Sequence, residues 1–445
     1  MTAPTRPSPL LGAPILSSVW RLAWPGVVLV LFQSSVSIAD TYYVGRLGTV
    51  PLAGLALVFP FVMMMQMLSA GAVGGGVSSA IARALGAGHH ARAEALLAHA
   101  VLLGLALGVV FAALMLLIGP PVYRLLGGGG APLAYALTYS VILFAGAPLV
   151  WVANFCANAL RGQGNTLLPA LVMSGAAVVH IPLTAYLTQA MGIAGTAWAY
   201  VIGYAAGALA LLVLLARGAG TLRLRIGGMQ WERRYFADIL GVGLLSSLSA
   251  IQTVFSALIL TGVVARFGVD ALAGYGVGVR LELLLVPLTF AVGAALVPLT
   301  GTHVGAGQHE RAKHIAWAGA GLGALIAAVI GLTVALAPQL WMDMFTRDAR
   351  VQAAGAAYLR IVGPFYVCVG IAVALYFASQ GPRRVGWPVL AGTARLIIAA
   401  GGGWLAVRMG AGIEAVFGCI AAGLVVWAAL TAAAVRLVSW RQSGP

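Results

Sequence analysis

Very few ionisable side chains interrupt the long apolar runs of this sequence, and Asp40 is the first acidic one. A charged side chain in lipid is costly, so each one inside an apolar run is a candidate functional residue. Gln33, Ser37 and Asp40 are spaced four and then three residues apart, which places them on one face of a helix. A carboxylate that binds a proton on one side of a membrane and releases it on the other could couple proton flow to transport. The alternative is an Asp that forms a turn at the outer end of its helix.

A second polar pair lies further along the first half of the chain. His180 and Thr184 are four residues apart and share a helical face. An imidazole titrates near neutral pH, so His180 could act as a partner for Asp40. The alternative is a core histidine that is hydrogen-bonded to a backbone carbonyl.

Charged residues also occur in the apolar runs of the second half. Glu282 follows Arg280 by two residues, so the two side chains point to different sides of a helix and are poor partners. Arg360, Arg395 and Glu414 lie in later runs, and we expect a buried charge network because lone charges there would be costly. Glu282 either binds a cationic substrate or coupling ion, or neutralises a structural arginine.

The elements that position these residues must be membrane helices. Of the 445 residues, 61% are hydrophobic and only 8% are charged, whereas a soluble domain carries about 25% charged residues. Runs this long and continuously apolar satisfy their backbone groups in lipid as helices. The sequence predicts an all-α polytopic membrane protein with twelve spans, at 17–43, 52–79, 95–118, 133–155, 167–188, 194–216, 239–264, 273–300, 314–337, 356–379, 386–407 and 411–435.

The charge distribution predicts an orientation in the membrane. The net charge of +15 could suggest nucleic acid as a partner, but most arginines fall in the segments that lie inside if both termini are cytoplasmic. That asymmetry is the one expected of a multi-pass protein of the cell inner membrane. The charge therefore sets orientation and contacts anionic lipid, and we expect no nucleic-acid partner.

The two halves of the chain repeat each other at an offset of about 219 residues. Six spans in each half bring both halves into the membrane in the same direction, so they are parallel repeats. We place the lobes at 1–222 and 223–445, and a cavity between them would be the path for alternating access. The matching motifs are Arg46-Leu-Gly48 with Arg266-Phe-Gly268, Gly86-Ala-Gly88 with Gly305-Ala-Gly307, Arg92-Ala93 with Arg311-Ala312, Gln163-Gly164 with Gln380-Gly381, and Met191-Gly192 with Met409-Gly410.

These features together resemble the multidrug and toxic compound extrusion (MATE) family, over nearly the whole chain. The resemblance implies twelve helices in two six-helix lobes, and export driven by a proton or sodium gradient. The motifs that carry it are Asp40-Thr-Tyr-Tyr-Val-Gly-Arg-Leu-Gly48, the two Gly-Ala-Gly loops with their Arg-Ala, Leu160-Arg-Gly-Gln-Gly-Asn165, Arg280-Leu-Glu282 followed by Pro287, and Ala378-Ser-Gln-Gly381.

The resemblance also implies roles for individual positions. The family's coupling aspartate falls at Asp40, and bending of the first helix at a proline, here Pro25, is linked in the family to protonation of that aspartate; a static kink is the alternative. Members that couple through this lobe commonly have Asn and Asp at the positions of His180 and Thr184, and Thr at that of Tyr200. This sequence departs at all three, which removes oxygens that a sodium ion would need. The departures favour the proton as coupling ion, with sodium as the alternative.

The two lobes are chemically unequal. Gln252 occupies the repeat position of Gln33, whereas the position of Asp40 is taken in the second half by Ile259 or Leu260. We therefore expect the lobes to share a scaffold and to do different jobs. The predicted cation-coupling residues are Asp40, His180, Thr184 and Tyr200, and the predicted substrate or charge network comprises Glu282, Arg280, Arg395, Gln33 and Gln252.

The function expected from these features is a proton-coupled antiporter, not an enzyme, that exports organic cations or amphipathic drugs and acts as a monomer. No cofactor or metal is expected, because the cysteines lack metal-ligand spacing and no Gly-Lys pair of a phosphate-binding loop occurs. Two alternatives stay open. A flippase for lipid-linked precursors tends to carry cationic residues in its cavity, and a non-transporting receptor would need a sensor segment.

Overall fold

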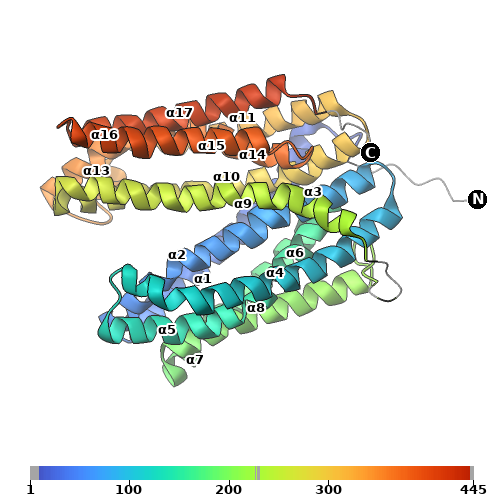
Figure 1. Ribbon diagram of the computed structural model, residues 1–445, viewed down its shortest axis with the longest axis horizontal. Helices are drawn as coiled ribbons and strands as arrows, with labels where there is room; N and C mark the ends of the chain where they lie inside the picture. The colour runs from blue at the N-terminus through green and yellow to red at the C-terminus, as the bar shows by residue number, and fades with distance from the viewer. Residues whose placement is uncertain (1–9, 226, 228–230, 441–445) are drawn as a thin grey trace, which may run out of the picture. The chain divides into compact units, whose positions relative to one another are not determined.

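The computed structural model describes residues 10–225, 227 and 231–440, and within them all regular structure is helical. Among the described residues, eleven helices are long and apolar enough to cross a membrane, and α5 (Gly130–Ala145) with α6 (Ala147–Gly162), bent by 47° at their junction, form a twelfth segment when the pair is taken as one span. Each of the twelve predicted spans coincides with one of these segments (Figure 1). Large apolar side chains such as Leu117 and Leu209 are 77% and 64% exposed, which is the exposure expected of surfaces that face lipid.

Contacts divide the described chain into two compact units. Unit 1 contains residues 24–244 and unit 2 contains residues 10–23 and 245–440. The predicted boundary at 222/223 falls in the connection before α9 (Arg233–Val264). The division by contacts instead runs through α1 (Ile15–Gly45), beside Pro25, and through α9.

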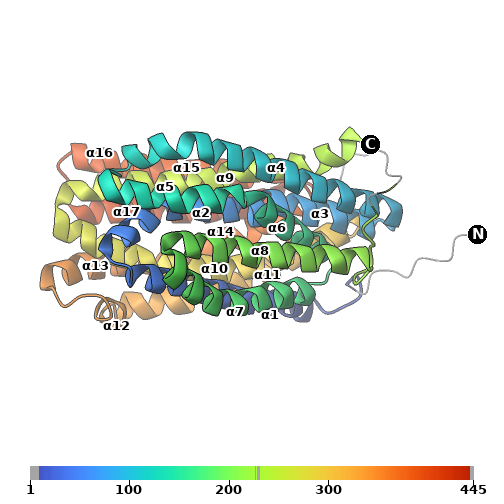
Figure 2. The ribbon, with the colours of Figure 1, turned by 90° about the horizontal axis from the view of Figure 1, so that it is seen from below.

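Unit 1 is a bundle in which α4, α5 and α8 run side by side (Figures 1 and 2). Its apolar core is rich in aromatic residues, among them Phe111, Phe144, Trp151 and Phe155. A π-helical segment interrupts the second span between α2 and α3. Besides α1, the unit 1 helices are α2 (Thr49–Gln66), η1 (Met67–Ala72), α3 (Val73–Gly86), α4 (His90–Leu125), α5 (Gly130–Ala145), α6 (Ala147–Gly162), α7 (Leu167–Met191) and α8 (Ile193–Ala216).

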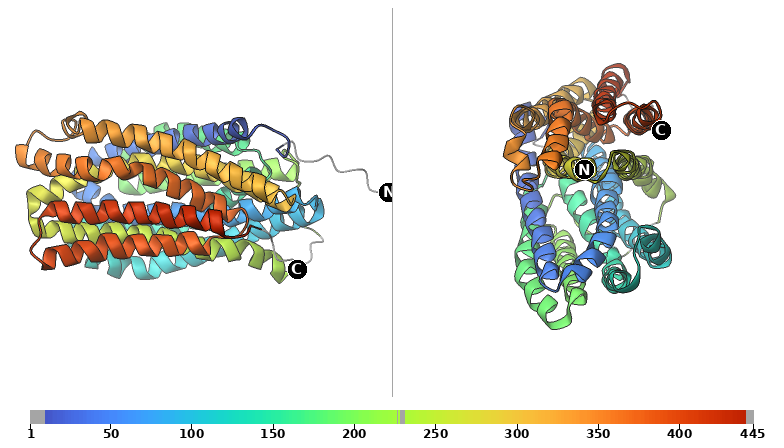
Figure 3. Two further views of the ribbon diagram at one scale, coloured as in Figure 1. Left: turned by 90° about the horizontal axis from the view of Figure 1, so that it is seen from above. Right: turned by 90° about the vertical axis from the view of Figure 1, so that its left-hand side faces the viewer.

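Unit 2 is a second bundle, in which α11 packs closely against α14 and α15 against α17 (Figure 3). Small residues permit this approach: a Cβ on Gly370 would lie 2.2 Å from the Gly323 carbonyl oxygen. Besides most of α9 and the first turns of α1, the unit 2 helices are η2 (Ala265–Phe267), α10 (Val269–Gly305), α11 (His309–Leu336), α12 (Gln339–Met342), α13 (Ala349–Val362), η3 (Gly363–Phe365), α14 (Tyr366–Gln380), α15 (Gly386–Leu396), η4 (Ile397–Gly401), α16 (Gly402–Arg408) and α17 (Ile413–Leu437).

Candidate functional site

The Asp40 carboxylate, near the end of α1, lies between polar groups of α7. Its Oδ1 atom is 2.8 Å from His180 Nε2 and accepts a hydrogen bond from Thr184 Oγ1 at 3.0 Å. All three side chains are buried. The four-residue spacing of His180 and Thr184 presents both to the same carboxylate oxygen, which joins two segments 140 residues apart in the sequence. A buried carboxylate in direct contact with an imidazole can exchange protons with it.

Close packing of α7 against α8 sets the position of the His180 ring. The two helices meet at Gly195, where a Cβ would lie 2.0 Å from the Leu187 carbonyl oxygen, and Thr188 and Thr196 share a buried hydrogen bond of 2.7 Å. Further along α8, Gly203 lies beside the ring: a Cβ there would be in van der Waals contact, 3.7 Å from His180 Nδ1. This packing also brings the Tyr200 ring edge-on to His180, with centroids 6.4 Å apart.

Tyr200 belongs to a polar network that the sequence did not lead us to predict. Gln66 Nε2 donates to the hydroxyl oxygens of Tyr200, at 2.6 Å, and of Tyr204, at 2.5 Å. Asn154 Nδ2 in turn donates to Gln66 Oε1 and to Ser69 Oγ. Ser69 lies in the π-helical segment η1, and π-helical turns occur often at functional sites. The network therefore connects the neighbourhood of His180 to an irregular turn of the second span.

Two signals in the sequence could have pointed to this network. Gln66 interrupts an apolar run, and Asn154 and Asn158 stand four residues apart in another, which marks a polar helical face. Polar side chains on transmembrane helices commonly hydrogen-bond across helices. The sequence gives no indication of η1, in which the Ala70 carbonyl oxygen accepts a hydrogen bond from Asn158 Nδ2 at 3.1 Å.

The remaining predicted residues of α1 lie apart from the Asp40 contacts. Gln33 is exposed within unit 1, and none of the hydrogen bonds described above involves it. Pro25 is buried, and α1 remains helical on both sides of it. Bending at Pro25 stays a prediction.

In unit 2, Glu282 lies in an aromatic setting. The Tyr358 hydroxyl donates a hydrogen bond to Glu282 Oε1, and the Tyr358 ring packs edge-on against Tyr275 and Phe417. Arg395 interacts electrostatically with Glu282, although its guanidinium lies over the Trp427 ring at 4.7 Å and not in ion-pair contact with the carboxylate. The direct partner of Glu282 is therefore a phenol and not an arginine.

The other predicted residues of the second half have separate partners. The Arg280 guanidinium lies 5.5 Å from the centroid of the Phe345 ring, away from Glu282. Gln252 Nε2 donates to Thr393 Oγ1 at 2.7 Å, while its Oε1 atom is buried without a partner in the described part of the chain. Arg360 and Glu414 line one cavity of about 570 Å³ at α12, α13 and α17. The structure thus distributes these charges over three places.

Replacing Glu282 by Gln tests whether its charge binds a cation. The amide keeps an acceptor for Tyr358 but removes the negative charge, so if Glu282 has the cation-binding role that the sequence predicts as one of two, the affinity for a cationic dye should fall by about tenfold or more. The measurement is dye binding to purified protein by fluorescence anisotropy. Tyr358→Phe, which removes the phenol and keeps the charge, is the matched control and should change affinity less. Unchanged affinity in Glu282→Gln would assign the carboxylate a structural role.

The sequence of this chain is similar to those of known membrane transporters. The MatE family model matches residues 25–186 and 246–405. A FAD transporter of Shewanella oneidensis is 27% identical over 87% of each chain, and a probable multidrug resistance protein NorM of Thermotoga maritima is 24% identical over 81% of this chain and 79% of its own.

Solved structures agree on the fold. A MOP superfamily transporter from Pyrococcus furiosus, described as having reversed polarity of its binding pocket, superposes with a TM-score of 0.91 at 24% identity and covers 98% of both chains. A MATE transporter in complex with MaL6 gives 0.88 at 25% identity, over 98% of both chains. With twelve membrane segments and a family match that spans both halves, this chain belongs to the MATE family of multidrug efflux transporters.

Proposed function

We propose that the protein exports organic cations or amphipathic drugs in exchange for protons. The observation that carries this proposal is the contact of Asp40 with His180 and Thr184. A carboxylate and an imidazole in contact provide two groups that can hold a transported proton. One of the three polar atoms in the contact is an imidazole nitrogen. Hard cations prefer coordination by oxygen atoms alone, so this set of atoms suits a proton better than a hard cation.

The proposed setting is the cell inner membrane, with both termini cytoplasmic and the protein acting as a monomer. The excess of arginine in the segments that would then face the cytoplasm supports this orientation. The aromatic setting of Glu282 supports a cationic substrate, because aromatic faces and a carboxylate both attract cations.

The test is efflux from proteoliposomes under separately imposed gradients. A cationic fluorescent dye is present at the same concentration inside and outside, the membrane potential is clamped, and either a proton or a sodium gradient is applied. We expect the proton gradient alone to move the dye against its concentration gradient. Under the sodium gradient alone, we expect the dye to move at the rate measured in liposomes without protein. Movement driven by sodium alone would refute proton coupling.

A second candidate substrate is a flavin dinucleotide, since one relative is a FAD transporter. The half-buried Arg395, stacked on Trp427, favours it because guanidinium groups bind phosphates and indole rings stack on planar heterocycles. The same liposomes loaded with FAD distinguish the two: release of FAD without release of dye would select the dinucleotide.

A further inference from the structure

The first turns of α9 belong to unit 1, although most of the helix belongs to unit 2. Contacts assign residues 233–244 to unit 1 and the rest of α9, from Leu245 on, to unit 2. The helix α1 has the converse arrangement, with residues 15–23 in unit 2 and Trp24 onward in unit 1. Each of these helices therefore runs from one unit into the other.

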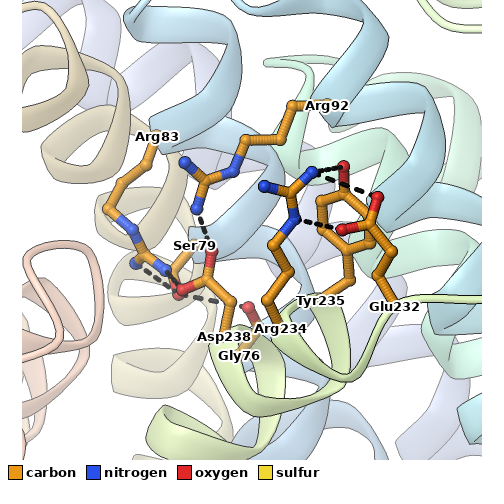
Figure 4. Close-up of polar contacts among 8 residues, drawn as sticks. All are labelled: Gly76, Ser79, Arg83, Arg92, Glu232, Arg234, Tyr235 and Asp238. Atoms are coloured by element: carbon orange, nitrogen blue, oxygen red, sulfur yellow. Dashed lines mark hydrogen bonds and ion pairs between the residues drawn. The ribbon is translucent and has the colours of Figure 1, made fainter. Parts of the chain in front are cut away.

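Asp238 anchors the first turns of α9 through two arginines (Figure 4). Its Oδ1 atom is 2.7 Å from Arg83 Nη2 of α3, and its Oδ2 atom is 2.9 Å from Arg92 Nη2 of α4. Arg83 Nη1 also donates to Ser79 Oγ at 3.1 Å. Asp238 and Arg83 are 5% and 6% exposed, so the pair is shielded from water and its separation would leave buried charges without compensation. We call Arg83, Arg92 and Asp238 the ionic clasp.

Neighbouring contacts hold the same turns against unit 1. His99 Nε2 accepts a hydrogen bond from the backbone N–H of Glu232 at 3.2 Å, and the rings of Tyr235 and Phe236 pack around its imidazole. On the other side, Gly243 of α9 lies directly on Val73 of α3: a Cβ on Gly243 would be 3.2 Å from Val73 Cβ. The clasp therefore lies on a closely packed contact of α9 with α3 and α4.

The repeat shows that the ionic clasp is particular to unit 1. At an offset of about 219 residues, Asp238 corresponds to Val19 and Arg83 to Thr302. Val19 is buried in an apolar core of unit 2. Arg311, the counterpart of Arg92, donates to the neutral backbone carbonyl of Ala13 at 2.7 Å. The start of α1 is thus held by apolar packing and a hydrogen bond from an arginine to a backbone carbonyl, whereas the start of α9 is held by ion pairs.

We propose that the ionic clasp keeps the first three turns of α9 attached to unit 1 throughout the transport cycle. Any change in the course of α9 then takes place beyond Leu244, and Asp238, Arg83 and Arg92 are positioning residues for transport. This inference holds for either coupling ion and for any substrate, because it concerns only where α9 is anchored.

A disulfide that replaces the clasp tests the proposal. Val73→Cys with Gly243→Cys is made in a chain whose three cysteines are replaced. A Cβ on Gly243 would lie 2.9 Å from Val73 Cα and 3.2 Å from Val73 Cβ, so the two helices must separate locally before the Cβ atoms reach the disulfide range of about 3.5–4.5 Å. Because the attachment is permanent in the proposal, the oxidised protein should transport dye at a rate similar to the reduced one. Transport that stops on oxidation and returns on reduction would show that these turns must leave unit 1, and would overturn the proposal.

The same disulfide should rescue loss of the clasp. Asp238→Asn leaves the buried guanidinium of Arg83 facing a neutral amide, so we expect dye transport to fall by about tenfold or more, and oxidation of the 73–243 pair to restore most of it. Arg92→Gln, which keeps the Arg83–Asp238 bond, serves as a milder variant with a smaller loss and the same rescue. Asp270→Asn, which removes an exposed carboxylate 3.2 Å from Arg350 Nε, is the matched control. Normal transport in Asp238→Asn, or a loss that oxidation leaves unchanged, would contradict the positioning role.

Discussion

Asp40→Asn is expected to abolish proton-driven dye efflux and to leave dye binding intact. The amide has the size of the carboxylate and can still pair with His180 and Thr184, so the local packing of α1 against α7 should persist. It cannot bind and release a proton, and an antiporter that cannot return its coupling ion completes no cycle. Efflux from proteoliposomes under an imposed proton gradient should therefore fall to the rate measured in liposomes without protein.

Two further measurements separate a coupling role of Asp40 from a structural one. Asp40→Glu keeps a carboxylate at a slightly different position and should retain part of the activity. Thermal unfolding of Asp40→Asn should occur near the wild-type temperature, because a neutral residue at a buried site removes a desolvation cost as well as a charge-assisted hydrogen bond. Proton-driven efflux that continues at the wild-type rate in Asp40→Asn would remove this residue from the coupling mechanism.

Hydropathy and helical spacing predicted the membrane spans and the candidate residues, because both are properties of a single helix. The scarcity of charge in the spans singled out Asp40, and the four-residue spacing of His180 and Thr184 predicted that both face one way. The repeat identified Arg92 and Arg311 as counterparts, and both prove to hold the start of a helix. The predicted substrate or charge network was less informative, since Arg280, Glu282 and Gln252 have separate partners.

The features that the sequence did not predict depend on which helices pack against each other. Periodicity gives the polar face of a helix but not the neighbour that this face contacts, so the links of Gln66 to Tyr200 and Tyr204 were not foreseen. The residue types of the second span likewise did not predict the π-helical turn η1. Asp238 was not predicted as a site residue because it lies one residue before the predicted span at 239–264, where charged residues are ordinary. In the structure α9 begins at Arg233, which places Asp238 inside the helix and against two arginines.

His180→Gln is expected to slow proton-driven efflux by about tenfold or more. A glutamine amide can donate an N–H to Asp40 Oδ1, as His180 Nε2 can, but it carries no proton that it can exchange. In the wild type the contact with Asp40 gains strength when the imidazole is protonated, whereas the glutamine amide stays neutral. We expect the two contacts to differ by about 1.4 kcal/mol or more, which corresponds to about tenfold in rate. The rate of efflux is measured at several pH values between 6 and 8, with the size of the proton gradient held constant.

The shape of the pH profile distinguishes the role of His180 from that of its neighbours. If the imidazole exchanges protons with Asp40, the wild-type rate should vary across this range and the His180→Gln rate should vary less, because an imidazole can bind and release a proton and an amide cannot. Thr184→Ser keeps the hydroxyl that donates to Asp40 Oδ1 and should retain the wild-type profile. Thr184→Val removes that donor and should lower the rate without flattening the profile. A His180→Gln protein with the wild-type rate and profile would mean that the histidine only orients Asp40, and that the carboxylate alone carries the coupling proton.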